Sequence, residues 1–148
     1  MTQSVPSDDD LDTLVGYQLQ MARLQLSEAA HTALAPYGIS PAKVTALALV
    51  RAQPGLDQSA LGRALSINRA SAMKLVNLLE ERGLVERRPG RNLRSHALHL
   101  TIEGEAQLRD MIGRLRASEA PLLATLSKAE RETLLRLLHR LHAPLSSD

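Results

Sequence analysis

The chain contains no cysteine, no phenylalanine and no tryptophan, and Tyr17 and Tyr37 are its only tyrosines. Without cysteine it can form neither disulfide bonds nor thiolate metal sites, and it cannot sense peroxide through a thiol. With so few aromatic rings, the core must be built from aliphatic side chains. This composition favours packed helices and disfavours a pocket that holds its ligand by aromatic stacking.

Membrane and export signals are also missing from the sequence. The N-terminus is acidic and polar, and no apolar run approaches the roughly 20 residues that span a bilayer. We therefore expect a cytoplasmic protein.

The patterns that carry catalysis are absent too. There is no glycine-rich phosphate loop, no H-E-x-x-H pair and no serine in a G-x-S-x-G setting. The adjacent carboxylates of Glu80 and Glu81 cannot face each other on a helix. We expect no enzymatic activity and no cofactor.

The region between residues 57 and 83 has the pattern of two short helices joined by a tight turn. Asp57 is placed to cap a first helix that runs to Leu65. Ser66 and Ile67 form the turn, and Asn68 can cap a second helix whose apolar residues recur at helical spacing until a glycine at position 83 ends it. This arrangement predicts a helix-turn-helix.

A basic hairpin follows directly. Two strands are expected, over residues 84–87 and 97–100, and the loop between them carries Arg91 and Arg94. A short turn with two arginines has the shape and charge to enter the minor groove of DNA. The sequence therefore predicts a small β-wing beside the helix-turn-helix, a combination typical of proteins that read duplex DNA.

The charge distribution supports DNA binding more strongly than the net charge of +2 does. From Arg63 to Arg94 there are eight basic side chains against three acidic ones, a local charge of +5, whereas residues 1–12 hold four aspartates and no basic residue. The positive field is thus concentrated where a phosphate-binding surface is expected.

The expected DNA contacts lie on the outward face of the second helix and on the wing. Arginine and lysine can donate to guanine or to phosphate, asparagine can make a polar contact, and small residues let the helix approach. The predicted contacts are Asn68, Arg69, Ala70, Ser71, Met73, Lys74, Asn77, Arg91, Asn92 and Arg94.

Three segments resemble the MarR family of winged helix-turn-helix regulators at the family's spacing. They are SINRASAMKL from residue 66, LEERGLVER from residue 79 and LHLTIEG from residue 98. The resemblance covers roughly residues 11–145. It implies a homodimeric transcriptional regulator, more often a repressor than an activator, that binds a pseudo-palindromic operator. One departure is that Asn92 stands where members usually carry an aspartate, which orients the wing arginine, here Arg94.

Long leucine-rich helices are expected on both sides of the winged domain. A first helix over about residues 10–35 should end at Pro36 and Gly38, and the next begins with Ser40 as cap and Pro41 at its first position. After the wing, Thr101 caps a helix that Pro121 is expected to kink or interrupt. A capping box over residues 127–130 then opens a last helix.

The fold class predicted is mainly α with a small β-wing, in which the apolar stripes of the terminal helices require a partner. A second copy of the chain is the expected partner, although a monomeric helical cap is an alternative. The predicted organisation is a disordered tail at 1–9, an N-terminal dimerisation helix at 10–38, the winged helix-turn-helix domain at 40–101 and C-terminal dimerisation helices at 102–145.

Ligand sites are less clearly marked in the sequence. The resemblance implies a small, often phenolic or acidic, effector between the dimerisation helices and the winged domain. The polar candidates to contact it are Tyr17, His31, Lys43 and Arg51. His139 and His142 are spaced to share a metal ion, but without cysteine and with few acidic neighbours we expect no metal site.

Two other functions fit the same sequence. The chain can be a constitutive DNA-binding protein with no effector, or a winged-helix module that has lost DNA binding and instead titrates a protein partner. The intact basic residues Arg69, Lys74, Arg91 and Arg94 argue against the second alternative, while nothing in the sequence excludes the first.

Overall fold

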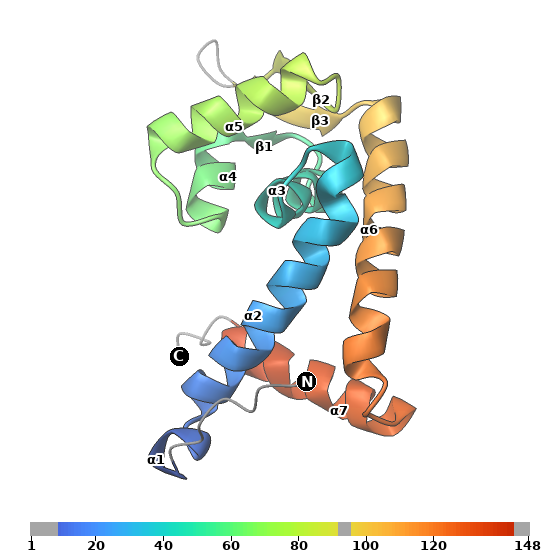
Figure 1. Cartoon of the computed structure of the whole chain (residues 1–148). Helices are drawn as coiled ribbons and strands as arrows, with labels where there is room; N and C mark the ends of the chain where they lie inside the picture. The colour runs from blue at the N-terminus through green and yellow to red at the C-terminus, as the bar shows by residue number, and fades with distance from the viewer. Residues whose placement is uncertain (1–8, 92–95, 144–148) are drawn as a thin grey trace.

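The computed structural model describes residues 9–91 and 96–143. Its elements are, in chain order, α1 (Asp9–Asp12), α2 (Val15–Leu34), η1 (Ala35–Tyr37), α3 (Pro41–Ala52), β1 (Leu56–Asp57), α4 (Gln58–Ala64), α5 (Arg69–Glu81), β2 (Val85–Pro89), β3 (His96–Leu100), α6 (Ile102–Leu123) and α7 (Lys128–His142). A winged domain built from α3 to β3 sits at one end of the long helices α2 and α6, and α7 lies at the far end (Figure 1).

The core lies in the winged domain and at the adjoining ends of the long helices, which are the C-terminal end of α2 and the N-terminal half of α6. It is entirely aliphatic apart from Met111, as the lack of phenylalanine and tryptophan requires. Leu47 of α3, Leu79 of α5, Leu98 of β3 and Leu108 of α6 are all fully buried. Burial of a leucine contributes roughly 1.5–3 kcal/mol, so these contacts hold α5 against the rest of the domain.

The sheet has the order β1-β3-β2, and both pairs are antiparallel. In the β2–β3 hairpin, Val85 pairs with Leu100 and Pro89 with His96. Both observed strands reach further toward the tip of the hairpin than predicted, β2 by two residues and β3 by one. Arg88 and Pro89 therefore belong to β2 rather than to the loop. The short strand β1 was not predicted, because a two-residue strand leaves no periodic pattern.

Close packing joins the wing to α6 at Gly104. A Cβ atom on this residue would lie 1.9 Å from the carbonyl oxygen of Leu84, so only glycine fits there. Thr101 caps α6 as predicted, since its hydroxyl oxygen accepts from the Gly104 amide at 2.9 Å. The same hydroxyl donates to the carbonyl of Gly83, which ties the start of α6 to the end of the helix-turn-helix.

The prediction of one continuous helix over residues 10–35 is wrong, because the helix is interrupted at Thr13 and Leu14, between α1 and α2. The Thr13 hydroxyl donates to the Asp10 carbonyl at 2.9 Å, and Gln18 Nε2 donates to the Asp12 carbonyl at 3.1 Å. Side chains thus take carbonyls that a continuous helix would use. Asp9 is already helical, so the predicted tail 1–9 is wrong at its last residue, and residues 1–8 lie outside the described ranges.

Two further expectations need correction. Ser40 occupies the cap position before Pro41, but its side chain makes no capping hydrogen bond. Instead, its carbonyl accepts from the amides of Lys43 and Val44. Pro121 does not interrupt α6, which continues to Leu123. A proline removes one amide donor wherever it stands in a helix, but only Leu122 and Leu123 follow it in α6, so little of the helix depends on this turn.

Other helix boundaries agree with the predictions. Gly38 ends the N-terminal segment in a left-handed conformation, and the capping box at Ser127 opens α7. The last helix ends at His142, whereas positions 144–145 of the predicted C-terminal region lie outside the described residues.

Within the described residues, no single helix is long and apolar enough to cross a membrane. The consecutive segments Val15–Tyr37 and Pro41–Ala52 pass such a test only together, and they meet at an angle of 77°.

Candidate DNA interface

The helix-turn-helix is built from α4 and α5, and each helix is capped by the residue predicted for it. The Asp57 carboxylate accepts from the Ala60 amide at 2.7 Å, and the Asn68 side chain accepts from the Ser71 amide at 2.8 Å. Between the helices, Ser66 adopts a left-handed conformation with φ of 54°. The tight turn allows Gly62 of α4 to lie directly against the Ala72 side chain of α5.

One face of α5 is buried and the opposite face is open. Ala72, Val76 and Leu79 point into the core. The predicted contact residues on this helix are all exposed: Asn68, Arg69, Ala70, Ser71, Met73, Lys74 and Asn77. The structure therefore places this part of the predicted site on a single accessible surface.

The wing is described up to Arg91, which is exposed after β2. Asn92 and Arg94, the other predicted wing contacts, lie outside the described residues. Their part in DNA binding stays a prediction, as does the effect of an amide at position 92.

Fewer basic side chains are free to bind phosphate than the eight counted in the sequence, although the local net charge of +5 is unchanged because that sum already subtracts the three glutamates. Arg87 pairs with Glu80 at 2.7 Å, and Arg88 pairs with Glu86. Arg82 donates to the Tyr37 carbonyl at 2.9 Å. In the described part of the chain, the basic side chains of this region that have no ion pair or protein hydrogen bond are Arg63, Arg69, Lys74 and Arg91.

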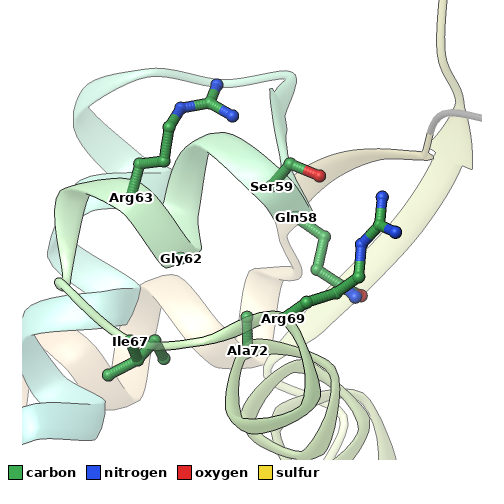
Figure 2. Close-up of a pocket in the computed structure, with 7 residues that line it drawn as sticks. All are labelled: Gln58, Ser59, Gly62, Arg63, Ile67, Arg69 and Ala72. Atoms are coloured by element: carbon green, nitrogen blue, oxygen red, sulfur yellow. The ribbon is translucent and has the colours of Figure 1, made fainter.

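A cavity of about 270 Å³ opens between α4 and α5 (Figure 2). The residues that line it are Gln58, Ser59, Gly62, Arg63, Ile67, Arg69 and Ala72. Two of the unpaired arginines, Arg63 and Arg69, therefore stand at its edges. Sequence reasoning missed Gln58 and Ser59, although both follow the Asp57 cap and so fall in the first turn of α4.

The four predicted effector contacts are not brought together within one subunit. Tyr17 and His31 are fourteen positions apart on α2, which separates them by about 21 Å along the helix. His31 Nδ1 lies 2.7 Å from the carbonyl of Ser27. Lys43 and Arg51 stand at opposite ends of α3, and Arg51 faces Glu105 of α6 at 3.8 Å.

His139 and His142 contact each other edge to face, with ring centroids 5.5 Å apart. In the ranges that the structure describes, no third histidine or carboxylate joins them to form a group that could hold a metal ion.

The fold and the exposed basic face of α5 define a winged helix-turn-helix DNA-binding protein. A profile of the MarR family matches residues 37–94. A protein from Thauera aromatica, named for transcriptional regulation of the hcr operon, is 33% identical over 147 residues, covering 93% of this chain and 89% of that protein. The chain belongs to the MarR family and is a DNA-binding transcriptional regulator.

Solved structures of two repressors and their complexes have the same fold. CouR bound to a 23-mer DNA duplex is 31% identical with a TM-score of 0.82, covering 93% of this chain and 99% of CouR. Rv2887 of Mycobacterium tuberculosis in complex with DNA is 26% identical with a TM-score of 0.76, covering 89% and 100%. CouR has also been solved with p-coumaroyl-CoA (29% identity, TM-score 0.77, coverage 95% and 100%), and Rv2887 with salicylic acid (27%, 0.72, 88% and 97%).

Proposed function

We propose that the chain is a homodimeric repressor in which α5 of each subunit enters the major groove of a pseudo-palindromic operator. The observation that carries this proposal is the single exposed face from Asn68 to Asn77, which presents Arg69 and Lys74 without protein partners in the described residues. The wing, with Arg91, Asn92 and Arg94, is expected to contact the flanking backbone or minor groove.

Dimer formation is inferred from the ends of the long helices. No residue of α7 is buried, even though the helix is rich in leucine. Its side chains Leu134, Leu135, Leu137 and Leu141 are 38%, 58%, 45% and 66% exposed. An apolar surface of this kind in a single subunit is expected to be covered by a second copy.

We further propose that operator binding is released by an aromatic carboxylate or by its coenzyme A thioester. The ligands in the solved complexes of Rv2887 and CouR belong to these two classes. Such a ligand can release DNA only if it binds a dimer geometry that the operator disfavours. Tyr17 and His31 cannot touch the same small acid in one subunit, because about 21 Å of α2 separates them.

We infer that the protein has no catalytic activity and acts in the cytoplasm as a ligand-controlled switch. Operator-bound protein should be titrated with benzoate, salicylate, p-coumarate and their coenzyme A thioesters, and separately with peroxide and with zinc. Fluorescence anisotropy of the labelled duplex reports the release of DNA. Release by at least one compound, with no release by peroxide or zinc, supports the proposal. If none of the compounds acts, the alternative of constitutive DNA binding is favoured.

A further inference from the structure

The guanidinium group of Arg87 joins three elements of the winged domain. Nη1 donates to Glu80 Oε1 of α5 at 2.7 Å. Nη2 donates to Asn77 Oδ1 of α5 at 2.6 Å and to Gln58 Oε1 of α4 at 3.2 Å. The Arg87 side chain is only 18% exposed, so the wing strand β2 is fixed to both helices of the helix-turn-helix.

Arginine has donors and no acceptor, and this fixes the orientation of the two amide side chains. Gln58 and Asn77 must each turn the carbonyl oxygen toward Arg87, and each amide nitrogen is therefore directed elsewhere. In residues 9–91 and 96–143, neither nitrogen donates a hydrogen bond to the protein.

Both amides lie at the DNA-facing surface. Asn77 is exposed and follows Met73 and Lys74 by one turn on the open face of α5. Gln58 lines the cavity between α4 and α5 together with Arg69 (Figure 2). The two amide groups thus belong to the same surface as the unpaired basic side chains.

We propose that Arg87 is a positioning residue that holds Gln58 and Asn77 as hydrogen-bond donors for duplex DNA. The acceptors they fit are phosphate oxygens and the groove atoms guanine O6 and N7, adenine N7 and thymine O4. Arg87 itself does not touch DNA in this arrangement, since its side chain is only 18% exposed, Glu80 balances its charge, and three of its five N–H donors are already used. This inference rests on the proposed operator binding and adds a determinant of sequence preference to it.

The first test compares an operator duplex, selected from a random library by the wild-type protein, with a scrambled duplex of equal composition. Arg87→Met removes the donors and keeps an unbranched apolar stem about as long as the aliphatic part of arginine. We expect the ratio of operator to scrambled affinity to fall by about tenfold or more, with the slope of log affinity against log salt unchanged. Arg88→Met is the matched control, because this neighbouring arginine pairs only with Glu86; it should keep the ratio.

A second variant separates orientation from stability. In Asn77→Asp the carboxylate still accepts from Arg87, so the thermal midpoint should not fall, whereas the donor to DNA is lost. Operator affinity should drop by about tenfold more than affinity for the scrambled duplex, which reports the effect of the added charge alone. If Asn77→Asp binds the operator as tightly as the wild type does, the contact is structural only and the inference is wrong.

A double-mutant cycle completes the test. If Arg87 acts through the two amides, Arg87→Met should cause no further loss of operator preference in a Gln58→Ala/Asn77→Ala background. Additive losses, or a salt slope that falls by about one in Arg87→Met, would show direct phosphate contact by Arg87 and overturn the inference. Failure of the wild type to enrich any duplex would instead reject the proposed function.

Discussion

The hydroxyl of Tyr37 donates a hydrogen bond to the carboxylate of Asp110, 73 positions further along the chain. Arg114 Nε donates to the same hydroxyl at 3.1 Å, and the Arg114 guanidinium lies 5.5 Å from the centre of the Tyr37 ring. The Tyr37 carbonyl accepts from Arg82, the C-cap residue that follows α5. Tyr37 therefore connects the end of α5 to the middle of α6.

Tyr37→Phe keeps the ring and the carbonyl contact and removes only the hydroxyl. We expect the free energy of unfolding to fall by about 1 kcal/mol, because the lost hydrogen bond is charge-assisted but exposed. Urea denaturation at a single protein concentration measures the change. Tyr17→Phe is the control, and an equal loss in both variants would contradict the role given to Tyr37.

The close contact at Gly104 predicts a severe effect of a single methyl group. A Cβ atom there meets the Leu84 carbonyl, which is itself held by the Thr101 amide at 3.1 Å. Gly104→Ala should cost several kcal/mol or abolish folding. Gly113→Ala in the same helix has open space and should stabilise by about 0.5–1 kcal/mol. A Gly104→Ala protein as stable as the wild type would refute the packing described for α6.

The capping box of α7 predicts a specific dependence on pH. Hydrogen bonds from the backbone amide and then the side chain of Ser127 hold the pKa of Glu130 below its ordinary value of 4.5. A carboxyl whose pKa is lowered in the folded state stabilises the fold above the ordinary pKa, and this contribution is lost as the pH falls through the lowered pKa. The thermal midpoint of the wild type should therefore exceed that of Glu130→Gln at neutral pH, and the difference should shrink below pH 4.5.

The control for this experiment is Glu119→Gln, which changes an exposed carboxylate in the last part of α6. It should show no comparable trend. A difference between wild type and Glu130→Gln that stays constant from neutral to acidic pH would argue against the capping role of the carboxylate.

The exposed leucines of α7 predict the outcome of a charge introduced among them. Leu135 is 58% exposed in the single subunit, so Leu135→Glu should be nearly neutral for a monomer. If α7 lies in a dimer interface, the variant should dissociate or fail to fold, as sedimentation at micromolar concentration will show. Thr125→Glu, in the exposed turn after α6, should leave the assembly intact. A Leu135→Glu protein with the sedimentation of the wild type would count against the proposed interface.

Local signals in the sequence predicted much of the winged domain. The caps at Asp57, Asn68 and Thr101 are satisfied within three residues, so the local pattern is enough to place α4, α5 and α6. The exposed face of α5 also follows from helical periodicity alone. The MarR assignment, first indicated by three short motifs, is confirmed by the relatives and the fold.

Contacts between distant segments were not predictable in this way. The count of basic residues treated Arg87 as part of a phosphate-binding surface, whereas its charge is balanced by Glu80 and two of its N–H donors bind the amide oxygens of Gln58 and Asn77. The break at Thr13 depends on side chains that bond back to the main chain, which apolar periodicity does not report. Likewise, nothing near Tyr37 in sequence indicates Asp110 as its partner.

Selection of duplexes from a random DNA library, followed by sequencing, tests the central claim most directly. The wild-type protein should enrich an inverted repeat whose half-sites lie about one helical turn, or 10–10.5 base pairs, apart. Lys74→Ala should fold normally and enrich a repeat with altered or relaxed preference at one position of each half-site. Enrichment of no sequence, or of an unrepeated single site bound by one subunit, would contradict a dimeric repressor that reads DNA through α5.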